Sequence, residues 1–150
     1  QLLPLIERRI EESGIDPSGL IFEVTETAAI ADLDRARTFI ETLKRLGCMF
    51  ALDDFGVGFS SFAYLKYLPV DYLKIDGSFV RDLLQNEVDQ HLVQAIVTVA
   101  RALGKKTIAE YVPDRETLDL LRRYQVDYAQ GFGIGEPAPL PAFLEVDEAA

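Results

Sequence analysis

Short apolar runs alternate with amphipathic stretches along this 150-residue chain. Runs of four to six mostly apolar residues predict five strands, at residues 20–25, 48–52, 72–75, 105–109 and 128–131. Between them, apolar residues recur every three or four positions, which predicts helices at residues 2–13, 32–46, 62–68, 79–84, 88–103 and 115–123. Gly47 and Gly104 directly follow two of these stretches and end the corresponding helices.

The alternation of strands and helices indicates an α/β fold. Strands that are continuously apolar are typical of parallel strands buried on both faces of a sheet. Two architectures satisfy this pattern: an open, doubly wound sheet and a (β/α)₈ barrel. Five strands in 150 residues fit the open sheet more simply, because a complete barrel takes about 250 residues. If the fold is a barrel, we expect an incomplete one within a single domain.

The composition narrows the classes of function. The chain is 49% hydrophobic, yet no apolar run is long enough to span a bilayer, and its start does not resemble a signal peptide. A net charge of -10 argues against a DNA-binding protein, which needs a basic surface. An acidic protein can still hold a phosphodiester if divalent cations lie between the two negative partners. The single cysteine, Cys48, fits a reducing compartment, so we expect a cytoplasmic domain whose parent protein could be anchored in a membrane.

Polar residues gather where the predicted strands end. The residues in question are Glu23, Asp53, Asp54, Lys74, Asp76, Glu110 and Gln130. Because the carboxyl ends of parallel strands share one edge of a sheet, we expect these side chains to converge. Taken singly, a carboxylate after a strand is often a helix cap, a reading open to Glu26 and Asp76. Five strand ends with such residues favour a functional site over independent caps.

Two of these features, the adjacent aspartates and the lone lysine, are hard to explain as local structure. Asp53 and Asp54 are adjacent carboxylates at the mouth of a buried sheet, and their repulsion costs stability unless cations neutralise it. Lys74 lies between two apolar residues of a predicted strand, where a buried ammonium group needs a carboxylate partner or a task. Both positions favour a functional site.

The candidate metal ligands are all carboxylates. No histidine or cysteine ends a predicted strand, and the one histidine, His91, falls inside a predicted helix. Oxygen ligands favour Mg²⁺ or Mn²⁺ over zinc. Adjacent aspartates with glutamates from other strands can bridge two ions about 3.5–4 Å apart, an arrangement that hydrolyses phosphodiesters. Gly56 and Gly58 predict a tight turn beside the aspartates and not a P-loop, because no Gly-Lys-Ser/Thr follows them.

Five short motifs along the chain together resemble one known family. They are FEVTET at residues 22–27, DDFGVG at 53–58, LKID at 73–76, AEYV at 109–112 and QGF at 130–132. These motifs resemble successive signatures of the EAL domain, in that family's order and at its approximate spacing. The resemblance implies a TIM-like barrel that hydrolyses the bacterial second messenger cyclic di-GMP to linear pGpG with two Mg²⁺ or Mn²⁺ ions.

The resemblance also implies the metal ligands. Glu23 matches a metal ligand, Asp53 matches the carboxylate that bridges both ions, and Asp54 matches a ligand of the second ion. Glu110 matches another ligand of the second ion, which is also assigned in the family as the general base.

Further residues match catalytic, substrate-binding and loop positions of the family. Lys74 matches a lysine near the attacking water and the phosphate, with Asp76 beside it in the catalytic set, and Gln130 matches a residue of the substrate pocket. Glu26 matches a glutamate that holds the loop after its strand, a loop tied to dimerisation and substrate binding. The family therefore implies a homodimer, and its members often carry upstream sensory or diguanylate cyclase modules.

Two features depart from the family pattern. The namesake Glu-Ala-Leu strand and a following Asn, both ligands of the first ion, should lie upstream of Gln1. We therefore expect residues 1–150 to form the C-terminal three-fifths of an EAL domain, without its N-terminal barrel strands. Pro113 stands where the family usually has a glutamate, three residues after the position of Glu110.

Three functional hypotheses follow. The first is a metal-dependent cyclic di-GMP phosphodiesterase, in which the 150-residue chain alone is weakly active or inactive. The second is a degenerate module that binds cyclic di-GMP without cleaving it, for which Pro113 is the one indication within the chain. The third is a half-barrel that serves dimerisation or results from truncation, and whose open strand edges would cause self-association.

Overall fold

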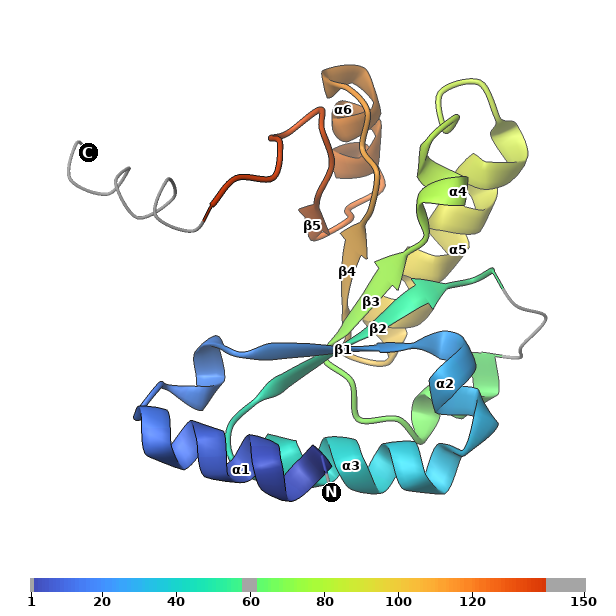
Figure 1. Cartoon of the computed structure of the whole chain (residues 1–150). Helices are drawn as coiled ribbons and strands as arrows, with labels where there is room; N and C mark the ends of the chain where they lie inside the picture. Colours follow the sequence, from blue (N-terminus) through green and yellow to red (C-terminus); the bar gives the residue numbers. More distant parts are fainter. Residues whose placement is uncertain (1, 58–61, 140–150) are drawn as a thin grey trace.

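The computed structural model describes residues 2–57 and 62–139, which are built around one parallel five-stranded sheet (Figure 1). Its strands are β1 (Ile21–Thr25), β2 (Met49–Phe55), β3 (Tyr72–Ile75), β4 (Lys106–Ala109) and β5 (Tyr128–Ala129). All five predicted strands are present. β2 continues through both aspartates to Phe55, beyond its predicted end at Leu52. Gly58, which we predicted to take part in the turn after β2, lies outside the described residues.

Helices connect the strands. The α-helices are α1 (Leu2–Ser13), α2 (Glu26–Ala31), α3 (Leu33–Arg45), α4 (Gly77–Val80), α5 (Glu87–Ala102) and α6 (Arg115–Arg123). Two 3₁₀ helices, η1 (Pro17–Gly19) and η2 (Phe62–Lys66), complete the set. The sequence did not predict α2, because six residues are too few to display a helical period. None of the helices in the described part of the chain is long and apolar enough to cross a membrane.

The strand order distinguishes the two architectures that the sequence left open. The order is β1-β2-β3-β4-β5, and every neighbouring pair is parallel. A doubly wound sheet reverses its strand order at a switch point, whereas a barrel adds each strand beside the preceding one. Figure 1 shows the strands turning steadily in direction from β1 to β4. The fold is therefore an incomplete β/α barrel.

Burial is uneven across the sheet. α3 packs against β2 and α5 packs against β3 and β4, and their apolar side chains form one core. Along β1, Phe22 and Val24 pack against this core, whereas Ile21 is 49% exposed and Glu23 lies on the same face as Ile21. The prediction that β1 is buried on both faces is therefore wrong, because β1 is an edge strand of the described sheet and its second face is open.

Polar side chains fix where several helices begin. Thr25 caps α2 by accepting the amide of Ala28, so the interpretation of Glu26 as a cap is wrong. Asp114 caps α6 by accepting the amide of Thr117 at 2.8 Å. Each cap satisfies a backbone amide that the helix itself leaves without a partner.

Candidate active site

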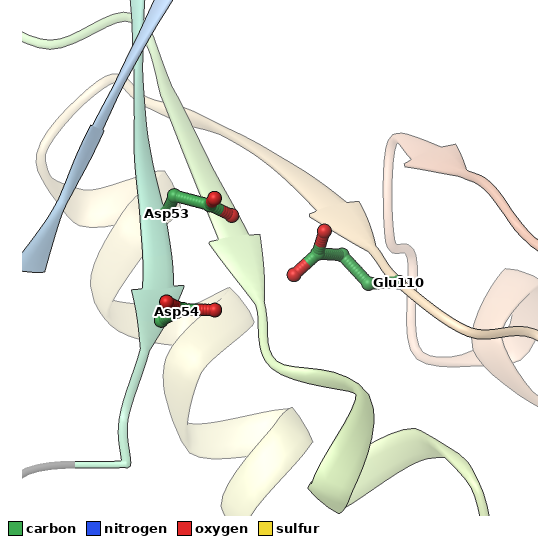
Figure 2. A group of neighbouring side chains, drawn as sticks. All are labelled: Asp53, Asp54 and Glu110. Atoms are coloured by element: carbon green, nitrogen blue, oxygen red, sulfur yellow. The ribbon is translucent and has the colours of Figure 1, made fainter.

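Three carboxylates meet at the carboxyl ends of β2 and β4. Asp53 and Asp54 lie in β2 and Glu110 directly follows β4, and one carboxylate oxygen from each lies within 4.8 Å of the others (Figure 2). Glu110 is buried, Asp53 is half-buried and Asp54 is exposed. The cluster therefore lies at the rim of the barrel, where solvent and ligands can reach it.

The backbone at Asp54 allows two adjacent aspartates to join one cluster. Neighbouring residues of a regular strand point to opposite faces of the sheet. Asp54 has a φ of 55°, and the pairing of β2 with β3 shifts register between Leu52 and Phe55. Such a bulge redirects side chains, and aspartate tolerates the left-handed backbone region better than most residues do. Both carboxylates therefore face Glu110.

Lys74 contacts three carboxylates, which come from β1, β2 and the end of β4. Its side chain is buried, and its Nζ atom lies 2.9 Å from Glu23, 3.1 Å from Asp53 and 3.0 Å from Glu110. The sequence predicted that a buried lysine here needs a carboxylate partner, and the structure supplies three. Glu23 lies outside the cluster of three carboxylates and is connected to it through Lys74.

The electrostatics of the site are dominated by negative charge. Burial by itself lowers the pKa of Lys74, but its contacts with Glu23, Glu110 and Asp53 outweigh burial and raise the pKa well above its usual range. Burial raises the pKa of Glu110, and the ion pair with Lys74 partly offsets this effect. Partial burial and the neighbouring Asp53 raise the pKa of Asp54. One ammonium group is therefore shared among more carboxylates than it can neutralise.

The donor atoms fit divalent cations. The Oδ1 atom of Asp53 is buried and accepts no hydrogen bond from any residue in the described part of the chain, although Lys74 Nζ lies at ion-pair distance. A buried carboxylate oxygen without a hydrogen bond is costly unless a cation contacts it; the Lys74 ammonium is that cation here, and a divalent ion would satisfy the same atom. All three ligand groups offer oxygen, which favours Mg²⁺, Mn²⁺ or Ca²⁺ over zinc.

Two other predicted residues border the cluster. Gln130 donates a hydrogen bond from Nε2 to Glu110 Oε1 at 3.3 Å. Asp76 lies outside the cluster of three carboxylates and caps α4, accepting the amide of Ser78 at 2.8 Å. The interpretation of Asp76 as a helix cap is therefore confirmed, and a catalytic role for it stays a prediction.

Glu26 lies apart from the metal-ligand candidates and ties two segments together. Its side chain is buried, accepts the amide of Gly56 at 3.0 Å and accepts a hydrogen bond from the Tyr64 hydroxyl. It thereby connects the start of α2 to the turn after β2 and to η2. The sequence did not predict the contribution of Tyr64, because a single tyrosine in an apolar stretch is indistinguishable from a core residue.

A cleft of about 870 Å³ opens beside the carboxylates. Its lining includes Glu110 and Gln130 together with Arg81, Tyr111, Phe132 and Ile134. A volume of this size matches that of ordinary ligand pockets, roughly 300–1,000 Å³. The site can therefore accept an organic ligand next to the metal-binding groups. Apart from Glu110 and Gln130, the sequence did not predict these residues as part of the site.

Comparison with known proteins agrees with this geometry. Residues 1–137 match the family model of the EAL domain. The chain is 48% identical over 124 residues to the cyclic di-GMP phosphodiesterase PdeB of Shewanella oneidensis, and the match covers 83% of this chain and 14% of that protein. It is 43% identical over 121 residues to the cyclic di-GMP phosphodiesterase PdeF of Escherichia coli, covering 81% of this chain and 16% of that protein. The chain thus spans roughly one seventh of the length of these curated relatives.

A solved structure has a similar fold. The PaMucR phosphodiesterase in its complex with c-di-GMP superposes with a TM-score of 0.87 and is 37% identical in sequence. The match covers 92% of this chain and 56% of that one. EAL domains have a TIM-like barrel, so the similarity confirms the incomplete barrel that the strand order indicates.

Proposed function

Because this chain belongs to the EAL domain family, we propose that the protein carrying it hydrolyses cyclic di-GMP to linear pGpG. The observation that carries the proposal is the cluster of Asp53, Asp54 and Glu110 next to the buried Lys74. The two relatives named above are called cyclic di-GMP phosphodiesterases, and the solved neighbour holds c-di-GMP. The family match and the local chemistry thus support the same reaction.

We assign two ions, Mg²⁺ or Mn²⁺, to the site. Asp53, Asp54 and Glu110 would hold one ion, and Glu23 with Asp53 would contribute ligands to the other, as the family resemblance implies. When bound, such ions neutralise the phosphate and lower the pKa of water. The exclusive use of oxygen donors and the buried Oδ1 atom of Asp53 support this assignment.

The protein's own residues then have distinct tasks. Lys74 holds a phosphate oxygen close to the attacking water, and Glu110, positioned by Gln130, accepts a proton from that water. The water oxygen forms a bond to phosphorus, the bond from phosphorus to the 3′ oxygen breaks, and the leaving oxygen takes a proton from solvent. Asp76, which caps α4, is included in the catalytic set because it matches the family position.

The proposal extends to the assembly of the parent protein. Residues 1–150 form one structural unit, the C-terminal portion of an EAL domain, which acts in the cytoplasm as a homodimer. The family resemblance implies a role in dimerisation for the loop that Glu26 holds, and the Glu26 side chain accepts the amide of Gly56 in the turn after β2. Sedimentation of the intact protein with and without Glu26→Ala tests this, and an unchanged monomer in both would contradict it.

The activity is tested in the intact gene product that contains this chain. Hydrolysis of cyclic di-GMP in Mn²⁺ is compared for the wild type, Asp53→Asn and Asp119→Asn. Asp119 is a matched control, because its exposed side chain on α6 pairs with Arg122 away from the cluster. We expect Asp53→Asn to lower kcat by about a hundredfold or more and Asp119→Asn to leave it unchanged. A wild type without turnover, or an Asp53→Asn variant with unchanged turnover, would overturn the proposal.

A catalytically degenerate binding module is not favoured. Such modules lose metal-binding carboxylates, whereas Asp53, Asp54 and Glu110 are all present and converge in this chain. Pro113, the one departure from the family pattern within the chain, lies on the wall of the cleft and not in the cluster. Calorimetry that shows tight binding of cyclic di-GMP in Mg²⁺ without hydrolysis would favour the binding module instead.

A further inference from the structure

Tyr111 occupies an unusual position next to the carboxylate cluster. It directly follows Glu110, and its backbone has a φ of 55°, in the left-handed region that residues other than glycine seldom adopt. Its side chain is nevertheless 62% exposed, so burial of the ring does not explain the strained backbone. A strained residue beside a functional cluster suggests that the position of its ring serves the site.

Contacts with α4 and its C-cap residue hold the ring. A Cβ atom at Gly77 would lie 2.3 Å from Tyr111 Cδ2, so the ring rests directly on the glycine. The Arg81 guanidinium lies 5.3 Å from the ring centroid, at the distance of a cation–π contact. Gly77 begins α4 and Arg81 is its C-cap, one helical turn further on. Tyr111 is 62% exposed and lines the cleft together with Arg81, so its ring is within reach of a ligand there.

A rigid wall limits the cleft beyond Tyr111. Val112 exchanges backbone hydrogen bonds with Gln130 and Gly133, at 3.0 and 2.9 Å. A Cβ atom at Gly131 would clash with the backbone of Val112 at 2.3 Å, so the two segments touch directly. On this wall, Phe132 is 75% exposed and Ile134 is 50% exposed, and both line the cleft. The cleft therefore exposes the ring of Tyr111, which directly follows Glu110, together with the apolar side chains of Phe132 and Ile134.

The charges around the cleft indicate which interactions can bind a nucleotide there. The chain carries a net charge of -10, Lys74 is engaged by carboxylates, and Arg81 lies on the Tyr111 ring. Apart from Lys74 and the metal ions, which act on the reacting phosphate, Arg81 is the one cationic group among the described residues that line the cleft. Aromatic stacking of a base needs no such charge and contributes about 1–3 kcal/mol per base.

We propose that the exposed ring of Tyr111 is the stacking platform for one guanine base of the cyclic dinucleotide, with Arg81 as a positioning residue that holds the ring. This inference rests on the proposed function. The base attached to the sugar next to the reacting phosphate would enter the cleft while the phosphate lies at the carboxylate cluster. Tyr111 then sets the affinity for the nucleotide and leaves the chemical step to Glu110 and Lys74.

Steady-state kinetics of the intact protein in Mn²⁺ test the platform. Because stacking is present in both the ground state and the transition state, Tyr111→Ala should raise KM about 5- to 150-fold and change kcat little. Tyr111→Phe retains the ring and should stay close to the wild type. Tyr67→Ala is the matched control, because Tyr67 is also 62% exposed and lines none of the cleft.

A fluorescence experiment distinguishes stacking from a general structural effect. The chain contains no tryptophan, so Tyr111→Trp places a single indole in it, at the platform. The emission of this indole is the spectrum of the variant minus that of the wild type. We expect cyclic di-GMP to quench this emission, because guanine in face-to-face contact quenches indole. Arg81→Ala should weaken binding less than Tyr111→Ala, and Arg81→Lys, which retains a cation over the ring, should restore part of the loss.

The outcomes separate this inference from the proposed function. If Tyr111→Ala leaves KM within about twofold of the wild type while Asp53→Asn abolishes turnover, the platform is wrong and the phosphodiesterase stands. An unquenched Tyr111→Trp variant that still turns over cyclic di-GMP leads to the same conclusion. If the wild type neither binds nor hydrolyses cyclic di-GMP, both proposals fail.

Discussion

Asp54 is adjacent to Asp53 in β2, yet its left-handed backbone lets both carboxylates join Glu110 in one cluster (Figure 2). In a regular strand the second aspartate would point to the opposite face of the sheet. The bulge between Leu52 and Phe55 thus determines whether the DD pair can serve one metal site or is divided between two faces. This relationship leads to the first prediction.

Two substitutions of Asp54 separate its backbone role from its carboxylate role. Asp54→Asn retains a side chain that tolerates positive φ and removes the repulsion from Asp53, so its free energy of unfolding in EDTA should be at least that of the wild type. Asp54→Val should lose about 1–2 kcal/mol, because a β-branched residue disfavours this conformation. Both variants should lose Mn²⁺-dependent turnover, since both lack the carboxylate. Urea unfolding and the hydrolysis assay check the two effects, and equal stabilities for Asn and Val would contradict the backbone argument.

Lys74→Met tests how the site is stabilised without metal. The substitution removes the one ammonium group that contacts Glu23, Asp53 and Glu110, so the free energy of unfolding in EDTA should fall by about 3 kcal/mol. Added Mn²⁺ should stabilise the variant more than it stabilises the wild type, because the cluster has lost a competing cation. Thermal unfolding with and without Mn²⁺ measures both.

The exposed Lys66 supplies the control for this experiment. Lys66→Met should change neither the stability in EDTA nor the response to Mn²⁺. A Lys74→Met variant that is as stable as the wild type in EDTA would show that the carboxylates are not held by the lysine.

The pair formed by Glu26 and Tyr64 should contribute to folding stability. Glu26→Ala leaves the Gly56 amide and the Tyr64 hydroxyl without this acceptor, so we expect a loss of about 2–3 kcal/mol. Tyr64→Phe removes one hydrogen bond to a carboxylate and should cost about 1.5 kcal/mol. The double variant should be less destabilised than the sum of the two, because the residues share an interaction. Additive losses in urea unfolding would contradict a direct coupling.

The cap of α6 should make stability depend on acid pH. The amide of Thr117, donated to the Asp114 carboxylate, lowers the pKa of Asp114 below its ordinary value of 3.8. A carboxyl group with a lowered folded-state pKa contributes stability above its ordinary pKa and loses that contribution as the pH falls through the lowered value. Asp114→Asn retains a neutral cap, so the advantage of the wild type should be smaller at pH 3 than at pH 7. A difference in unfolding free energy that is the same at both pH values would contradict this.

Much of the fold and site is predictable from local pattern. α1, β3 and α6 have their predicted bounds, because each has a full apolar period or run with clear end signals. Lys74 was predicted to need a carboxylate partner because an ammonium group between apolar strand residues has few other solutions. Placing the carboxylates on one edge required only that the strands are parallel.

The sequence alone determined the alternation of strand and helix, the acidic character of the site and the three carboxylates that converge in it, because these depend on residue type and short-range spacing. Only the tertiary structure decided that the sheet is part of a barrel, that β1 is half exposed and that Asp54 shares a face with Asp53. It also brought Arg81 onto the ring of Tyr111 and opened the cleft beside Glu110. Strand order, edge exposure and contacts between distant segments follow from packing over the whole chain, which no local pattern encodes.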